Sequence, residues 1–119
     1  MALTDFGKAI RKARIDTGEN LGTMADALNV TPAFLSGVET GRKKVPATMV
    51  QQVRDFFKAR GVVLSGLEEL AAVANKSVSL EGLSPQHQML VAGFARSNLD
   101  ADTLQKMTKL LSAADKGDQ

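Results

Sequence analysis

The stretch that most constrains the fold runs from residue 20 to residue 42, where the sequence predicts two short helices joined by a tight turn. The first helix is expected over residues 21–28. Asn29 suits the turn because its short polar side chain can hydrogen-bond its own backbone in the left-handed conformation. Thr31 and Pro32 then predict the second helix, because a hydroxyl caps a helix N-terminus and a proline fits the first helical position.

The apolar residues of this stretch are spaced so that the two helices can pack on each other. They are Met24, Leu28, Val30, Leu35 and Val38. Ala25 is small where the helices are expected to cross, and Gly41 is expected to end the second helix. Two helices joined in this way can bind DNA when the second one is free to enter the major groove.

Several positions at fixed spacing carry a resemblance. They are Ala25, Asn29, Val30, Thr31, Leu35-Ser36, Val38-Glu39 and Gly41-Arg42, with Ile10-Arg11 and Arg14 upstream. With these residues the chain resembles the phage repressor and Cro (XRE-type) family of helix-turn-helix transcriptional regulators, which more often has glycine at the turn. The resemblance covers about residues 3–60 and implies a lambda-repressor-like helical bundle.

Helical periodicity and capping residues predict an all-α chain. Beyond the two central helices, further helices are expected over residues 4–17, 46–60, 67–75, 84–97 and 101–114. We therefore expect a helix-turn-helix domain over residues 1–61, a C-terminal helical dimerisation region over residues 62–115, and a frayed tail at residues 116–119.

One segment departs from the helical pattern. In residues 77–81, Val78 and Leu80 alternate with polar side chains, which is typical of a short strand. The chain offers no second strand to pair with it, so the segment is either an extended connector or a strand that pairs with another chain. We favour antiparallel pairing across the two-fold axis of a dimer.

Charge is distributed unevenly along the chain. Residues 1–60 contain ten Lys and Arg against six Asp and Glu, a net charge of +4, whereas residues 61–119 contain five against seven, a net charge of −2. The basic half is the half with the two central helices, and basic surfaces suit phosphate.

Composition excludes several classes of function. The chain has no cysteine, so it can form neither a disulfide nor a thiolate metal site. His87 is its single histidine, no paired carboxylates or nucleophile–base pair are recognisable, and no glycine-rich phosphate loop is present. We expect a non-enzyme without metal or cofactor. With no apparent leader sequence or membrane-spanning run, we also expect a cytoplasmic protein.

In the family that the chain resembles, the outward face of the second central helix reads DNA bases. The corresponding residues here are Thr31, Pro32, Ala33, Ser36, Gly37 and Thr40. None of these side chains can form the bidentate hydrogen bonds that Gln, Asn or Arg make with purines. Direct readout is therefore expected to be sparse, and specificity would depend on DNA shape, on water or on flanking basic residues.

The resemblance also implies contacts with the DNA backbone. The expected phosphate-binding residues are Asn20, Leu21, Arg11, Arg42, Lys43 and Lys44. The family often has Gln where this chain has Leu21, which removes one usual phosphate contact. Finally, the resemblance implies an ion pair between Arg14 and Glu39 that orients the reading helix.

The C-terminal helices are amphipathic and too short to bury their apolar faces alone. We expect dimerisation through Val78, Leu80, Leu90, Phe94 and Leu104.

The leading interpretation is a dimeric repressor that binds a palindromic operator in double-stranded DNA through the helix at 31–40; contact with polymerase is a further option. The alternative is an antitoxin-type autoregulator whose C-terminal half binds a toxin. A segregation factor that spreads along DNA is a third option.

Overall fold

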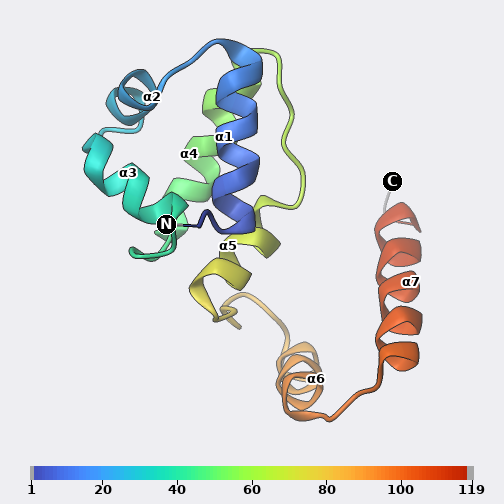
Figure 1. Cartoon of the computed structure of the whole chain (residues 1–119). Coiled ribbons are helices and arrows are strands. Elements are labelled where there is room, and N and C mark those ends of the chain that lie inside the picture. Colours follow the sequence, from blue (N-terminus) through green and yellow to red (C-terminus); the bar gives the residue numbers. More distant parts are fainter. Residues whose placement is uncertain (1, 118–119) are drawn as a thin grey trace. The chain divides into compact units, whose positions relative to one another are not determined.

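The computed structural model describes residues 2–117, with side chains for residues 2–114, and these residues are all-α (Figure 1). The chain divides into two compact units, Met1–Ser79 and Leu80–Gln119. None of the helices in the described residues is long and apolar enough to span a lipid bilayer.

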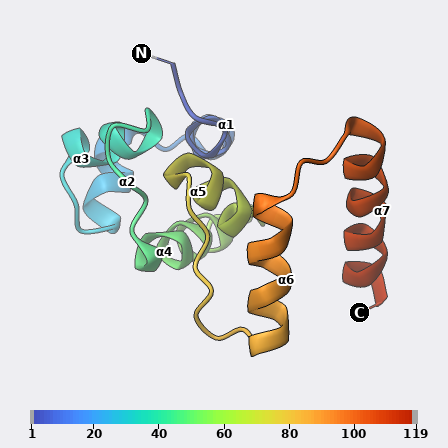
Figure 2. The ribbon, with the colours of Figure 1, turned by 90° about the horizontal axis from the view of Figure 1, so that it is seen from below.

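The first unit contains five helices. They are α1 (Asp5–Thr17), α2 (Leu21–Ala27), α3 (Pro32–Glu39), α4 (Ala47–Lys58) and α5 (Leu67–Asn75). Figure 2 shows α4 and α5 side by side, and α1 contacts α3, α4 and α5. The helices therefore enclose one common core.

Local chemistry sets the ends of α2 and α3. The side chain of Asn20 accepts a hydrogen bond from Thr23 N (2.8 Å), and Thr23 Oγ1 accepts one from Asn20 N (3.1 Å), which together form a capping box. Asn29 has the expected left-handed backbone (φ 59°). Thr31 Oγ1 accepts from the amide of Phe34 (3.0 Å), so the predicted cap of α3 is present.

The core of this unit is apolar and closely packed. Its largest fully buried side chains are Phe6, Ile10, Met24, Leu35, Val38, Met49, Val53, Phe57 and Leu67. Burying one such side chain is worth roughly 1.5–3 kcal/mol. The aromatic rings of Phe56 and Phe57 meet edge to face with their centroids 4.9 Å apart. These side chains hold α3 against the other helices.

The structure places the boundary between the units later than residue 61, where it was expected. Leu67 and Ala71 on α5 are buried in the core with α1 and α4. Helix α5 therefore belongs to the N-terminal unit because its apolar face completes that core. The C-terminal unit begins only at residue 80.

The strand expected at residues 77–81 is absent from the single chain. Residues 77–80 have no regular secondary structure, and Leu83 N donates to Leu80 O (3.3 Å) in a turn. A strand needs a second strand beside it, and none is assigned among the residues that the structure describes; the amide of Ser77 instead donates to Ala72 O (3.1 Å). Pairing with a second chain stays a prediction.

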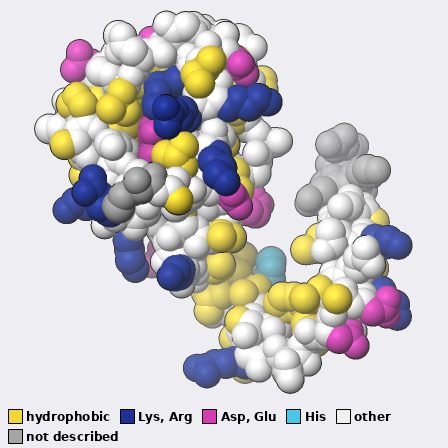
Figure 3. Space-filling model, in the orientation of Figure 1, with side chains coloured by type: hydrophobic (Ala, Val, Ile, Leu, Met, Phe, Trp, Pro, Cys, Tyr) yellow, Lys and Arg dark blue, Asp and Glu magenta, His cyan; other side chains and the backbone are white. Residues whose placement is uncertain are grey.

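The second unit contains α6 (Pro85–Arg96) and α7 (Ala101–Gly117). Ser84 and Asp100 cap them by accepting from the amides of His87 (3.1 Å) and Thr103 (2.8 Å). Helix α7 continues to residue 117, into the tail that was expected to be frayed, and residues 118–119 lie outside the described part. Between residues 80 and 114 no residue is buried, and Figure 3 shows hydrophobic side chains gathered on the surface of α6.

Candidate nucleic-acid interface

Helix α3 has one buried face and one exposed end. Leu35, Val38 and Glu39 point into the core, and each is at most 4% exposed. Thr31, Pro32 and Ala33, in contrast, are exposed at its first turn. The first turn of α3 is thus free to contact another molecule, and the core fixes its direction.

The other residues expected to read bases are less accessible. Ser36 and Thr40 are half-buried. Thr40 Oγ1 donates to the backbone carbonyls of Ser36 (3.1 Å) and Gly37 (3.3 Å), so its proton is already engaged. Gly37 is buried, which corrects its assignment to the outward reading surface. The stem of Lys43 lies across it, and the backbone amide of Lys43 donates to Gly37 O (3.1 Å).

A basic loop follows α3. Arg42, Lys43 and Lys44 are all exposed, as their expected role in binding phosphate requires. Arg42 and Lys43 also line an open hollow of about 580 Å³, together with Thr31, Ala33, Phe34 and Gly37. The hollow joins the exposed turn of α3 to the basic loop in a single surface.

Asn75, the last residue of α5, holds the end of this loop. Its side-chain Oδ1 accepts a hydrogen bond from Val45 N (2.7 Å), and its Nδ2 donates to Val45 O (3.0 Å). This pair of bonds satisfies both backbone groups of Val45 as a neighbouring strand would. This role could not be predicted from the sequence, because Asn75 looks like an ordinary helix terminus.

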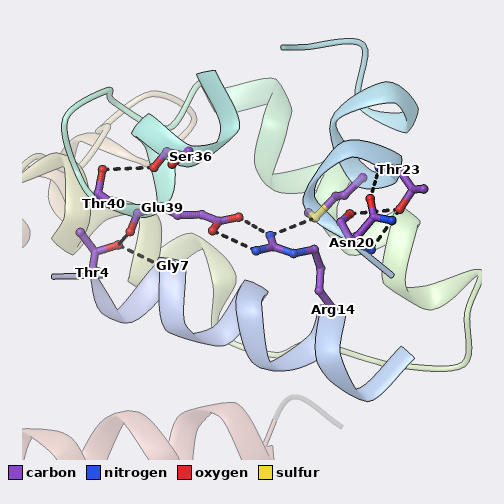
Figure 4. A network of polar contacts seen from close by, with 9 residues as sticks. Thr4, Gly7, Arg14, Asn20, Thr23, Ser36, Glu39 and Thr40 are labelled. Carbon is purple, nitrogen blue, oxygen red and sulfur yellow. Dashed lines mark hydrogen bonds and ion pairs between the residues drawn. The ribbon is translucent and has the colours of Figure 1, made fainter. Parts of the chain in front are cut away.

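The expected ion pair between α1 and α3 is present (Figure 4). Arg14 Nη1 donates to Glu39 Oε2, and Arg14 Nη2 donates to Glu39 Oε1 (3.2 Å). Arg14 Nη1 also lies 3.8 Å from the sulfur of Met24 on α2. One guanidinium therefore links three helices at the base of α3.

The start of α1 makes a second contact with the end of α3, which sequence reasoning missed. Thr4 N and Thr4 Oγ1 both donate to the carbonyl of Glu39, at 3.0 and 3.2 Å. Gly7 lies directly beneath this carbonyl. A Cβ on Gly7 would overlap with the carbonyl oxygen and lie 2.9 Å from the Cα of Glu39. Only a glycine lets the two backbones approach this closely.

The N-terminus of α2 is less favourable to phosphate than expected. Asn20 is exposed, but its side-chain oxygen is used in the cap, and Leu21 is half-buried against the core. Glu19 accepts a hydrogen bond from Thr23 Oγ1 (2.8 Å), so a carboxylate already lies at this helix end. Arg60, which donates to Glu19 (2.6 Å), lowers the pKa of that carboxyl below its usual value, and the Thr23 hydroxyl adds to the effect.

Two further side chains named from the sequence are exposed. Arg11 lies on α1, where its guanidinium is available to a ligand, and His87 lies in the first turn of α6. Among the residues that the structure describes, no three His, Cys, Asp or Glu side chains cluster as a metal site would require.

The residues expected at a dimer interface are accessible. Val78, Leu90, Phe94 and Leu104 are 62%, 72%, 45% and 44% exposed, and Leu80 is half-buried. An open, mostly apolar groove of about 600 Å³ lies within the second unit. It is lined by Gln86, Met89, Leu90, Gly93, Phe94, Ser97, Leu99 and Met107.

Comparison with protein-family models, curated protein sequences and solved structures gave no match to this chain.

Proposed function

We propose that the protein is a sequence-specific regulator of transcription that binds double-stranded DNA through α3, and that it acts as a dimeric repressor. One observation carries the proposal. The first turn of α3 is exposed beside three basic residues, Arg42–Lys44, while the opposite face of the helix is fixed in the core. A rigid, outward helix end next to a basic loop suits a major groove flanked by phosphates.

Each part of this surface has a role in the proposed complex. Thr31 offers a hydroxyl to a base edge, and Pro32 and Ala33 offer apolar contact, for example to a thymine methyl group. Arg42 and Lys44 neutralise backbone phosphates and position the helix. The Arg14–Glu39 pair keeps α3 at one angle to the bundle. Repression would follow when the protein covers a promoter.

In the proposed dimer, the C-terminal unit forms the interface with the second copy of the chain. Seven large apolar side chains of α6 and α7 are exposed by 37–75%: Met89, Leu90, Phe94, Leu104, Met107, Leu110 and Leu111. At roughly 200 Å² for a fully exposed large side chain, they present on the order of 800 Å², which is about what each partner contributes to a stable interface. A dimer would also match a two-fold symmetric operator, with its two α3 helices about 34 Å apart.

The decisive experiment is the selection of bound sites from random duplex DNA with the purified full-length protein, repeated across salt concentrations. The proposal expects a palindromic consensus. It also expects affinity to fall steeply with salt, by about 0.9 log units per log unit of salt for each neutralised phosphate. Binding without sequence preference, or no binding at low salt, would refute it.

The apolar groove also favours a second candidate. In an antitoxin-type autoregulator, α6 and α7 would cover a partner protein rather than a second copy, while α3 still bound DNA. Sedimentation of the purified protein separates the two. A dimer at micromolar concentration supports the repressor, and a monomer that aggregates through its apolar groove supports the antitoxin. Both candidates are non-enzymatic, need no cofactor, and place the protein in the cytoplasm with its DNA.

A further inference from the structure

The side chain of Lys43 is packed against the reading helix rather than extended away from it. Its Cγ lies 2.8 Å, and its Cβ 3.6 Å, from the point that a Cβ on Gly37 would occupy. Its backbone amide donates to Gly37 O (3.1 Å). The missing side chain at position 37 thus makes the space in which the lysine stem lies.

This packing brings a cation to the surface where bases were expected to be read. Lys43 lines the same hollow as Thr31 and Ala33, whereas Lys44, its neighbour in the chain, is exposed but does not line it. The two lysines are therefore not equivalent. Lys44 is free to follow the DNA backbone, and Lys43 is held beside the exposed turn of α3.

We propose that Lys43 is a specificity-determining residue, whose ammonium donates hydrogen bonds to O6 and N7 of a guanine in the major groove. The proposal rests on the function proposed above and deepens it. A lysine ammonium is a donor only, and guanine is the base that presents two adjacent acceptors in the major groove. Thr31, Pro32 and Ala33 provide at most one hydroxyl, so the cationic donors of this hollow are Arg42 and Lys43, and of these two only Lys43 packs its stem against α3 at Gly37.

Gly37 is the positioning residue of the pair. A lysine side chain is flexible, and fixing it for a directional contact costs conformational entropy. Packing against Gly37 restricts the conformations of the Lys43 side chain before DNA binds. Replacement by alanine would place a methyl carbon 2.8 Å from Cγ of Lys43, which is too close for two carbon atoms, and so displace the stem, while improving the helix propensity of α3.

The test compares four full-length proteins by the selection of bound sites: wild type, Lys43→Ala, Gly37→Ala, and Lys44→Ala as the matched control. In Lys43→Ala, we expect the preference for G·C at one position of each half-site to fall at least about fivefold, with the other positions unchanged. Gly37→Ala is expected to weaken the same position. Lys44→Ala should lower affinity for all sequences about equally and reduce the salt dependence by about one phosphate. Circular dichroism spectra check that each variant is folded.

The outcomes separate this inference from the proposed function. If wild type selects a consensus and Lys43→Ala weakens binding to every sequence equally, as Lys44→Ala does, then Lys43 binds phosphate and the inference is wrong. If wild type selects no consensus at all, the proposed function itself is wrong.

Discussion

Arg14 on α1 and Glu39 on α3 form a two-pronged ion pair in which the side chains are only 9% and 5% exposed. The pair joins α1 to the last residue of α3, and Arg14 also reaches Met24 on α2. Two charges so little exposed to water are costly unless each satisfies the other. The pair therefore couples the direction of α3 to the position of α1.

We expect Glu39→Ala to lower the free energy of unfolding by about 3–5 kcal/mol, because it leaves the Arg14 guanidinium buried without a partner. Urea denaturation measures this. Glu68→Ala is the control, since Glu68 pairs with Arg54 at the surface and its loss should cost no more than about 1 kcal/mol. Equal effects of the two substitutions would show that the buried pair has no special role.

The contact at Gly7 gives a second prediction about stability. Gly7→Ala must push α1 away from the carbonyl of Glu39, and overpacking of this kind costs about 1–3 kcal/mol or more. Alanine would otherwise stabilise a helix, so the sign of the change is diagnostic. Thermal unfolding checks it, with Lys8→Ala on the exposed side of α1 expected to change stability by less than about 0.5 kcal/mol. A stabilised Gly7→Ala protein would contradict the close approach.

The two hydrogen bonds between Asn75 and Val45 predict an effect on the basic loop. Asn75→Ala removes both hydrogen bonds to Val45, so the Val45 amide should exchange with solvent faster and DNA affinity should fall as the loop loosens. Asn75→Asp keeps the acceptor for Val45 N but puts a carboxylate oxygen, which repels Val45 O, in place of the donor, so protection of the Val45 amide should lie between those of wild type and Asn75→Ala. Hydrogen exchange measured by NMR, residue by residue, tests this order. Unchanged protection of Val45 in Asn75→Ala would refute it.

Local signals in the sequence predicted most of the N-terminal unit. The cap at Thr31 and the turn at Asn29 act within three or four residues, so the chain alone specifies them. The place of α5 was not predictable in this way. The apolar face of α5 shows that the helix packs against another element, but the sequence does not identify that element. In the structure it packs against α1 and α4.

The exposed surface of α3 was predicted in part. The family resemblance placed Thr31, Pro32 and Ala33 outward, and they are exposed. The same resemblance placed Gly37 outward, but a glycine has no side chain to keep a neighbour away, and Lys43 covers it. The covering group comes from the loop after the helix. Periodicity within a helix carries no information about side chains that fold back from outside it.

Two surface ion pairs make it possible to test the pKa of Glu19 and that of Glu68 independently. Arg60 lowers the pKa of Glu19, and Arg54 lowers that of Glu68, mainly by hydrogen bonding to the ionised carboxylate. A lowered folded-state pKa contributes stability above the unfolded pKa of a glutamate, and this contribution is lost as the pH falls through the folded value. NMR titration should show that Arg60→Ala raises the pKa of Glu19 alone and Arg54→Ala that of Glu68 alone. Shifts that fail to follow the substituted partner would disprove the pairing.

The proposed dimer makes the last prediction. Leu90 and Phe94 lie four residues apart on one face of α6 and are 72% and 45% exposed in the single chain. Replacing both with lysine should weaken self-association by about a hundredfold or more, because burial of each side chain is worth roughly 1.5–3 kcal/mol. Sedimentation velocity over a range of concentrations measures this. Ile15→Lys is the control, since Ile15 is 71% exposed on α1, outside the C-terminal unit, and its replacement should leave association unchanged. The double variant should also lose affinity for a palindromic site while it keeps the affinity of wild type for an isolated half-site. A double variant that still sediments as a dimer would place the interface elsewhere on the molecule.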